Sequence, residues 1–140
     1  MTTSLAEAPN IEPARSALMR RIGPKNTKPE MVVRQTLHRL GYRFRLHAKE
    51  LPGRPDIVFR PRKKVIFVHG CFWHRHPGCR KSTSPKTRRE FWEAKFAANQ
   101  ARDARVQEDL IALGWQCLII WECETSDLIC LEDRLKVFLR

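Results

Sequence analysis

Side chains that bind metals or move protons are concentrated in residues 65–79, VIFVHGCFWHRHPGC. Within it, Cys71, His76 and Cys79 are spaced C-x4-H-x2-C, and Cys123 follows the last strongly apolar run of the chain. Thiolate and imidazole are ligands that zinc prefers, and a closed set of three cysteines and one histidine is typical of a structural site. The spacing therefore predicts a structural Zn²⁺ site. The alternative is that the first two cysteines are ordinary buried thiols and that Cys123 is unrelated to them.

A single carboxylate, Asp56, stands at the head of the preceding apolar run, in LPGRPDIVF. Many Mg²⁺-dependent nucleases place an Asp on one strand and an acidic-x-Lys motif on the next, but Phe67, Val68 and His69 occupy those positions here. Mg²⁺ tolerates one protein carboxylate because it keeps several waters and accepts phosphate and carbonyl oxygens. The proton-handling task of the missing lysine can pass to a histidine, whose ordinary pKa lies near neutrality.

A histidine base works better when an acceptor fixes its orientation, and Asp103 in NQARDAR is a candidate for that role. Each candidate carboxylate also has a simpler interpretation. Asp56 can merely cap a turn, Glu30 can merely close a helix cap, and Asp103 can merely pair with Arg102 or Arg105. The residue types alone leave these alternatives open.

The overall charge points to a polyanionic partner. The 140 residues carry 27 Lys and Arg against 15 Asp and Glu, a net charge of +12. Clustered basic groups bind nucleic acid because phosphate contacts release counterions. A ribosomal protein, or a merely well-solvated basic surface, is the alternative.

The composition also indicates the cellular setting. The N-terminal sequence has neither a basic segment nor an apolar stretch typical of a signal peptide, and no window is apolar for long enough to cross a membrane. We therefore expect a cytoplasmic, nucleoid-associated monomer. Because disulfides are disfavoured there, the five cysteines are expected to bind a metal or to pack in the core.

These residues need a scaffold, and the apolar patterning predicts one α/β domain over residues 15–140, preceded by a flexible arm at residues 1–14. A short basic helix is expected near residues 15–24. The remaining order is helix, three strands, helix, strand and helix, at residues 27–41, 42–47, 55–59, 65–68, 87–113, 115–122 and 130–139.

Local signals support these boundaries. Thr27 with Glu30, and Thr87 with Glu90, have the spacing of capping boxes, and a glycine follows each of these two helices. Alternation with neighbouring apolar residues assigns Cys117 to the core, and Cys130 in the last helix is likewise assigned to packing.

Four blocks, LPGRPDIVF, VIFVHGCFWHRH, KTRREFWEAKFAANQARDARV and LGWQCLIIWEC, resemble the signature motifs of the very short patch repair (Vsr) endonucleases. The resemblance runs from about residue 15 to residue 123. It implies a restriction-endonuclease-like fold, with a mixed central sheet flanked by helices. It further implies a Mg²⁺-dependent enzyme that nicks double-stranded DNA on the 5′ side of the thymine in a T·G mismatch, where mismatch-repair factors are possible partners.

The resemblance assigns roles to matching residues. Asp56 is implied as the metal-binding carboxylate, with the main-chain carbonyl of Val68 as a further Mg²⁺ ligand. His74 is implied as the general base, oriented by Asp103. His69 and Glu30 are implied to complete the site beside the phosphate, and the zinc ligands are implied to be Cys71, His76, Cys79 and Cys123.

Aromatic and basic residues are implied to contact DNA. Phe72, Trp73 and Trp92 match a wedge that enters beside the mismatch, where a weakened base step lowers the energy of unstacking. Met19 matches a residue that enters from the opposite groove. The implied phosphate contacts are Lys86, Arg88 and Arg89.

The sequence departs from the family pattern at two points. Val68 replaces a frequent Thr, which a role of the main-chain carbonyl tolerates. The interval from His76 to Cys79 is one residue longer than in the best-known pattern, and Pro77 and Gly78 form a plausible turn to absorb it.

Two other functions remain open. One is a zinc-stabilised module that binds mismatched or bent DNA without cutting it; the joint presence of Asp56, His69, His74 and Asp103 favours the enzyme instead. The other is a related nicking enzyme with a different mismatch or sequence context.

Overall fold

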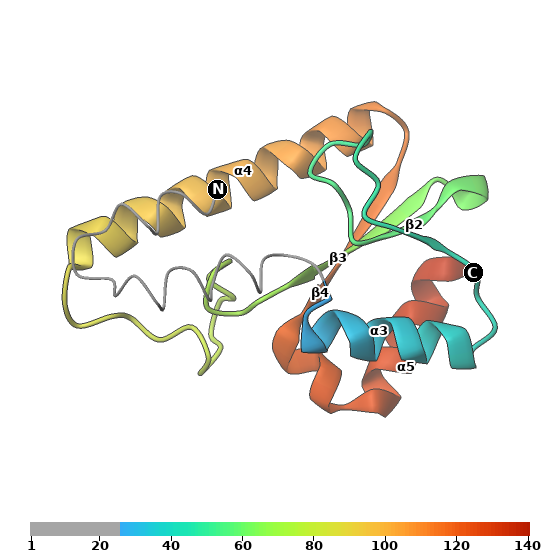
Figure 1. The fold of residues 1–140 in the computed structure, drawn as a ribbon, viewed down its shortest axis with the longest axis horizontal. Coiled ribbons are helices and arrows are strands. Elements are labelled where there is room, and N and C mark those ends of the chain that lie inside the picture. The colour runs from blue at the N-terminus through green and yellow to red at the C-terminus, as the bar shows by residue number, and fades with distance from the viewer. Residues whose placement is uncertain (1–25) are drawn as a thin grey trace.

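The computed structural model describes residues 26–140, so the arm at residues 1–14, the basic helix near residues 15–24 and Met19 lie outside the described part. A four-stranded sheet carries helices on both faces (Figure 1). Its elements are α3 (Lys28–Arg39), β1 (Arg45–Leu46), β2 (Ile57–Phe59), β3 (Lys64–His69), α4 (Arg89–Ala112), β4 (Gln116–Trp121) and α5 (Leu128–Leu139), with single 3-10 turns at Arg60–Arg62 and Glu122–Ser126. The predicted element order is confirmed.

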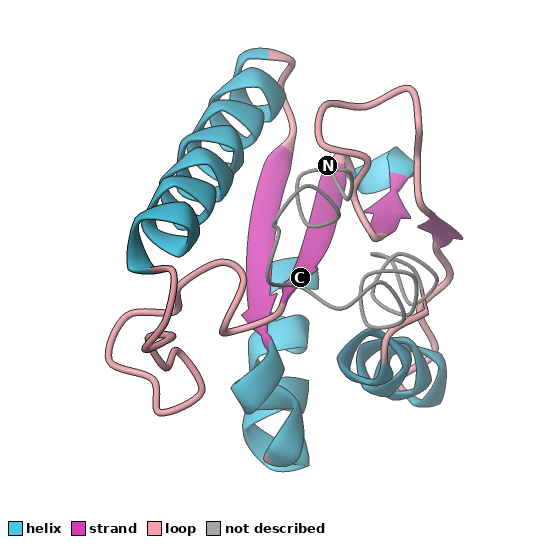
Figure 2. Cartoon of the chain, turned by 60° about the vertical axis from the view of Figure 1, so that its left-hand side comes forward, coloured by secondary structure: helices cyan, strands magenta, loops and turns pink. Residues whose placement is uncertain are grey.

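The sheet is mixed, with strand order β1-β2-β3-β4. Strands β1, β2 and β3 pair antiparallel, whereas β3 and β4 pair in parallel. The crossover between the two parallel strands contains the long helix α4, as a parallel connection requires. Figure 2 shows the loop of residues 70–88 leaving the end of β3 and leading to this helix.

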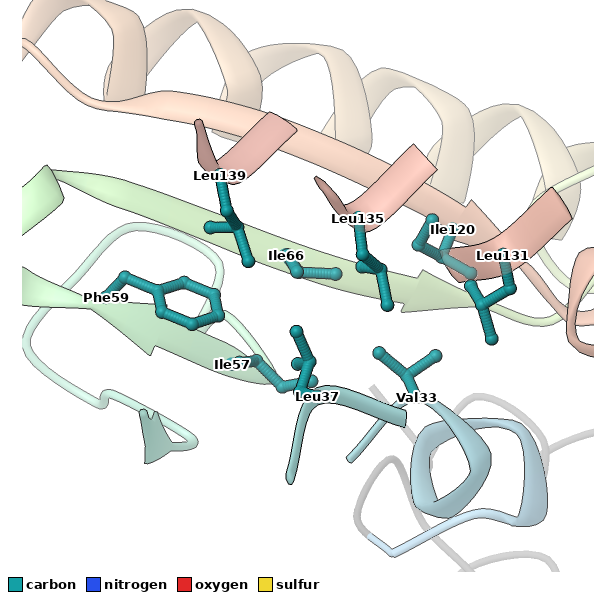
Figure 3. Packing of buried hydrophobic residues seen from close by; sticks show 9 residues of the cluster. All are labelled: Val33, Leu37, Ile57, Phe59, Ile66, Ile120, Leu131, Leu135 and Leu139. Carbon is teal, nitrogen blue, oxygen red and sulfur yellow. The ribbon is translucent and has the colours of Figure 1, made fainter. Parts of the chain in front are cut away.

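Alternation along the strands divides the core into two layers. Odd-numbered residues of β3 pack with Leu110 of α4 and with Trp115, in the layer on one face. Even-numbered residues and the other face of β2 pack against α3 and α5, as Figure 3 shows. The buried members of that second layer are Val33, Leu37, Ile57, Phe59, Ile66, Ile120, Leu131, Leu135 and Leu139. Cutting one of these leucines back to alanine costs about 2–5 kcal/mol in a well-packed core.

The helix ends agree with the sequence signals only in part. Thr27 caps α3 by accepting the Glu30 N–H at 3.4 Å, but the Glu30 side chain turns to other partners, so only half of the predicted capping box forms. The second capping box is wrong. The α4 helix begins after Arg88, which has a left-handed backbone and makes no side-chain cap.

Two further predictions need correction. The half-buried strand expected at residues 42–47 is reduced to Arg45–Leu46, because only these two residues pair with β2; Tyr42 and Phe44 pack against the α3–α5 layer from outside the strand. Cys130 is exposed on α5, so its assignment to packing is wrong, whereas Cys117 packs against the α4 layer as predicted.

In the part of the chain that the structure describes, no helix combines the length and apolar character needed to cross a membrane.

Candidate functional site

The candidate residues meet at one edge of the sheet. Because β3 and β4 are parallel, His69 at the end of β3 lies opposite Trp121 at the end of β4. The antiparallel β2 starts at the same edge, which brings Asp56 beside the end of β3. Segments that are distant in the sequence therefore deliver their polar residues to one place.

Asp56 is fixed by the neighbouring strand. The N–H of Val68 on β3 donates to Asp56 Oδ2 at 2.8 Å. Burial, together with the nearby Glu30 carboxylate, raises the pKa of Asp56 to about 7, although the Val68 hydrogen bond and Arg34 oppose the rise. A bound cation beside this carboxyl would favour its ionised form. Asp56 is thus an oriented, poorly solvated carboxyl of the kind that holds a metal ion.

The turn before Asp56 depends on a glycine. Gly53 has a φ of +73°, and a Cβ added there would lie 2.3 Å from Val106 Cγ1 on α4. Only glycine allows this turn to approach the helix so closely. The PGR portion of the LPGRPDIVF motif therefore packs the turn before Asp56 against α4.

A histidine pair lies beside this edge. The rings of His69 and His74 stack with centroids 3.8 Å apart and an angle of 10° between their planes. Asp103 of α4 places its Oδ2 2.6 Å from His74 Nδ1. Burial first, and then the neighbouring His74, lower the pKa of His69 to about 3, so His69 is neutral at physiological pH. An acceptor on Nδ1 leaves Nε2 of His74 with its lone pair, the arrangement of a histidine base.

The four predicted zinc ligands converge. Donor atoms of Cys71, His76, Cys79 and Cys123 all lie within 4.8 Å of one another. His76 Nδ1 is 3.6 Å from Cys71 Sγ and 3.4 Å from Cys123 Sγ. Ligands of a tetrahedral zinc ion with ordinary bond lengths are separated by about 3.5 Å. The cluster fits a closed four-ligand metal site.

The longer His76–Cys79 interval is absorbed by a tight turn. The N–H of Cys79 donates to the carbonyl of His76 at 3.3 Å, and Gly78 has a φ of +69°. Proline at the second turn position and a positive-φ glycine at the third are the pattern of a type II turn. Ser82 donates its hydroxyl to the carbonyls of Cys71 and His76, which fixes the remainder of the loop.

The thiols of this cluster differ in their tendency to ionise. Burial raises the pKa of the Cys71 thiol to about 12 and raises that of Cys123, whereas the N–H of Lys81 lowers the pKa of Cys79. A cluster of this kind holds its cysteines as thiolates only when a metal ion offsets the loss of solvation.

The predicted wedge residues form one aromatic cluster. Phe72 and Trp73 of the loop have centroids 5.9 Å and 5.7 Å from Trp92 on α4. All three are half-buried, and Arg75 covers the ring of Phe96 at 4.1 Å. A surface hollow beside them is lined by residues that include Arg75, Trp92 and Phe96.

The predicted phosphate contacts flank this cluster at the start of α4. Lys86 and Arg89 are exposed, and the Arg88 guanidinium lies 5.1 Å from the centroid of Phe91. Of these basic residues, Arg89 lines the same surface hollow as Trp92.

Glu30 meets the site through residues that the sequence reasoning missed. His47 Nε2 lies 2.9 Å from Glu30 Oε2, and Arg34 forms an ion pair with the same oxygen. The side chains of Glu30, His47 and Asp56 bring one donor atom each within 4.8 Å of the others. His47 carries no motif signal; it could have been found only by extending the β1–β2 pairing from Leu46 opposite Ile57 to the next pair.

Supporting residues were also missed. Asn99 donates to the carbonyl of Trp73 at 3.3 Å, and Glu122 accepts the N–H of Cys71 at 3.3 Å. Trp121 stacks on His76 at 4.2 Å and meets His69 edge-on at 5.3 Å. Helical spacing could have suggested Asn99, four residues before Asp103, but no local pattern distinguishes the other two.

Comparisons with known proteins agree with this geometry. The family model described as DNA mismatch endonuclease Vsr matches residues 11–81. Type II nicking enzyme V.XorIIP of Xanthomonas oryzae pv. oryzae is 54% identical over 125 residues, 89% of this chain and 91% of that protein. Type II nicking enzyme V.NmeAIP of Neisseria meningitidis is 39% identical over 126 residues, 90% of this chain and 89% of that protein.

A third relative carries the family's own name. DNA mismatch endonuclease Vsr of Escherichia coli is 45% identical over 109 residues, 78% of this chain and 69% of that protein. The family match spans Asp56, His69 and His74 and three members of the cysteine–histidine cluster, Cys71, His76 and Cys79. The chain therefore belongs to the Vsr family of DNA mismatch endonucleases.

Proposed function

We propose that this protein is a Mg²⁺-dependent endonuclease that nicks one DNA strand on the 5′ side of the thymine in a T·G mismatch. The fold we propose for it is restriction-endonuclease-like, with Zn²⁺ as a structural ion. The observation that carries the proposal is the meeting, at one sheet edge, of an oriented carboxyl with a histidine whose Nδ1 is held by an aspartate. The names of relatives, which include nicking enzymes and a mismatch endonuclease, support it.

Proton transfer falls to His74. Asp103 accepts a hydrogen bond from the Nδ1–H of His74, which fixes the tautomer. Its carboxylate also stabilises the imidazolium that forms when Nε2 takes a proton from water. His69 stays neutral beside it, because its pKa lies near 3. A neutral neighbour adds no charge that would resist protonation of His74.

The metal-binding part of the site falls to Asp56, with the main-chain carbonyl of Val68 as the second protein ligand. The Val68 N–H fixes the carboxyl orientation before any ion arrives. When bound, Mg²⁺ supplies electrostatic stabilisation of the charge that develops on the phosphate and the leaving oxygen. Hydrolysis on this pattern leaves a 3′-hydroxyl and a 5′-phosphate.

Mismatch recognition falls to the aromatic cluster. Phe72 and Trp73 directly precede His74 in the sequence and pack with Trp92, and Lys86 and Arg89 are exposed at the start of α4. Apolar rings that enter a base step kink the duplex, and a mismatched step costs less to open. Basic residues at the α4 N-terminus would hold the backbone while the rings probe the step.

The test is strand scission on end-labelled duplexes. The zinc-loaded protein is mixed with T·G, T·A and C·G duplexes that are identical elsewhere, in Mg²⁺ or in a chelator that removes Mg²⁺. We expect one nick, 5′ to the thymine, in the T·G duplex with Mg²⁺ only.

Other outcomes identify the alternatives. Tight binding of the T·G duplex without a nick in any flanking sequence would overturn the proposal in favour of a mismatch-binding module. A nick that is equally fast at another mismatch would retain the chemistry but overturn the T·G assignment.

A further inference from the structure

Glu30 presents a buried carboxylate oxygen that its protein partners do not satisfy. The side chain is only 1% exposed. Both Arg34 and His47 bind Oε2, whereas Oε1 is buried without a hydrogen-bond partner among residues 26–140. A buried unsatisfied oxygen of a charged group is costly, so its retention calls for an explanation. A cation beside Oε1 would supply the missing interaction.

The sheet holds His47 beside the Glu30 carboxylate, where its Nε2 lies 2.9 Å from Oε2. The main-chain N–H of His47 donates to the main-chain carbonyl of Asp56 at 3.1 Å. This hydrogen bond extends the β1–β2 ladder by one pair beyond Leu46 and Ile57. The φ of +49° at His47 lies in the left-handed region, which non-glycine residues adopt rarely and at a cost. The strained backbone and the ladder together place the imidazole between α3 and the start of β2.

Two carboxylates and one imidazole therefore converge from three parts of the chain. Glu30 comes from the first turn of α3, His47 follows β1, and Asp56 precedes β2, and one donor atom of each lies within 4.8 Å of the other two. Asp56 Oδ2 accepts the Val68 N–H, and the carboxyl has a second oxygen to offer. Arg34 and His47 both bind Oε2 of Glu30, which leaves Oε1 as the carboxylate oxygen without a hydrogen-bond partner among the described residues.

We propose that Glu30, His47 and Asp56 form a divalent-metal seat in which His47 Nε2 is a nitrogen ligand, and that this seat binds Mn²⁺ more tightly than Mg²⁺. Mg²⁺ strongly prefers oxygen, whereas an imidazole ligand suits transition metals. In the contact with Glu30, Nε2 of His47 donates to Oε2; as a metal ligand the imidazole would carry its proton on Nδ1 and offer the Nε2 lone pair to the ion instead. The seat rests on the proposed function in that it shares Asp56 and Glu30 with the proposed catalytic site.

The experiment measures Mn²⁺ binding to the zinc-loaded protein without DNA. Mn²⁺ is the probe because it binds protein ligands most weakly among the divalent first-row transition metals from Mn²⁺ to Zn²⁺. It will therefore not displace zinc from the cysteine thiolates. Electron paramagnetic resonance of free Mn²⁺ gives the affinity, and pulsed measurements detect nitrogen bound to the ion. We expect a histidine nitrogen signal in the wild type. In His47→Gln we expect no such signal and a dissociation constant for Mn²⁺ at least tenfold higher than in the wild type.

Matched variants isolate His47. His38→Gln changes an exposed histidine on the last turn of the same helix as Glu30, and it should bind Mn²⁺ like the wild type. His69→Gln changes the histidine at the end of β3, and the nitrogen signal should persist. His47→Asn is the substitute if His47→Gln does not fold.

Two results overturn the seat: wild-type protein that binds Mn²⁺ without a nitrogen signal, and a signal that survives loss of His47. Nicking in Mg²⁺, measured separately, distinguishes this failure from that of the proposed function. If the wild type nicks the T·G duplex in Mg²⁺ but lacks the nitrogen signal, only the proposed metal seat is overturned. If the wild type shows the nitrogen signal but never nicks the duplex, the metal seat is supported and the proposed nicking activity is overturned.

Discussion

At the scale of single residues, the chemistry depends on which atoms are already held in place. Asp103 holds Nδ1 of His74, and Val68 holds one oxygen of Asp56. Neither contact needs a substrate in order to form. The site is therefore preorganised, which lets a small enzyme direct its binding energy to the DNA instead of to its own side chains.

Asp103→Asn should slow nicking by about 10²- to 10⁴-fold, because an amide does not fix the imidazole in the required tautomer and does not stabilise its cation. Affinity for the mismatched duplex should change little. Single-turnover nicking rates and binding isotherms measure the two effects. Asp109→Asn, at an exposed position of the same helix, is the control and should retain the wild-type rate. A normal rate in Asp103→Asn would show that Asp103 does not orient the base.

Gly78→Ala should lower the free energy of unfolding by about 1–2 kcal/mol, because its φ of +69° forces alanine into the left-handed region. No atom lies within 4 Å of the added Cβ, so the cost is one of backbone conformation and not of collision. Denaturant unfolding of the zinc-loaded protein measures it. Gly70→Ala, whose Cβ would make only ordinary contacts at 3.8 Å and beyond, should cost less. Equal costs would contradict the turn assignment.

At the scale of elements, apolar alternation predicted most of the scaffold. Odd and even residues of β3 and β4 do face different layers, and glycines do follow α3 and α4. The failures arise where tertiary contacts replace a local signal. Thr87 does not cap α4, because the helix starts after the left-handed Arg88. Glu30 does not close its capping box, because Arg34 and His47 bind its carboxylate.

The site was predictable to a different degree. The convergence of the four zinc ligands was expected, and the structure brings them together. His47 could not be expected from spacing, because its role arises from a cross-strand neighbour and an unusual φ. The contact of His74 with Asp103 joins residues from a loop and a helix, and only the packed fold establishes it.

The Asp127 carboxyl, which caps α5, should make the stability of the protein depend on pH. Asp127 accepts the N–H of Cys130, and this hydrogen bond holds the pKa of the Asp127 carboxyl below its ordinary value. A depressed folded-state pKa stabilises the protein above the unfolded pKa of about 4, and this contribution is lost as the pH falls through the lower folded value. Unfolding of wild type and Asp127→Asn is compared from pH 6 to pH 3. The wild-type advantage should shrink with acidification, whereas a difference that is constant with pH would contradict this role.

At the scale of the whole molecule, the cysteine–histidine cluster and the histidine pair lie on either side of one tryptophan. Trp121 contacts both His76 of the zinc cluster and His69 of the histidine pair. Loop residues 70–88 run from the end of β3 to the start of α4 and carry the aromatic cluster with them. Loss of the zinc ion should therefore disturb folding, the base and the wedge together.

Cys71→Ser should remove the bound zinc and lower the free energy of unfolding by more than about 3 kcal/mol, because structural zinc contributes folding energy directly. Elemental analysis and denaturant unfolding measure the two effects. Cys130→Ser is the matched control, since Cys130 is exposed on α5 and is not a member of the cluster. A stable Cys71→Ser protein with one zinc per chain would show that the ligand assignment is wrong.

The most direct test of the proposed catalytic site, at the sheet edge where Asp56 meets the end of β3, compares DNA nicking and DNA binding in Asp56→Asn. This substitution keeps the shape of the side chain but removes its charge. Single-turnover nicking of the T·G duplex in Mg²⁺ is measured beside the dissociation constant for the same duplex. Because Asp56 is proposed to hold the metal ion and not the DNA, nicking should fall by at least about 10³-fold, whereas the dissociation constant should change less than about threefold. Nicking at the wild-type rate, or loss of binding together with nicking, would contradict the assignment of this edge as the catalytic centre.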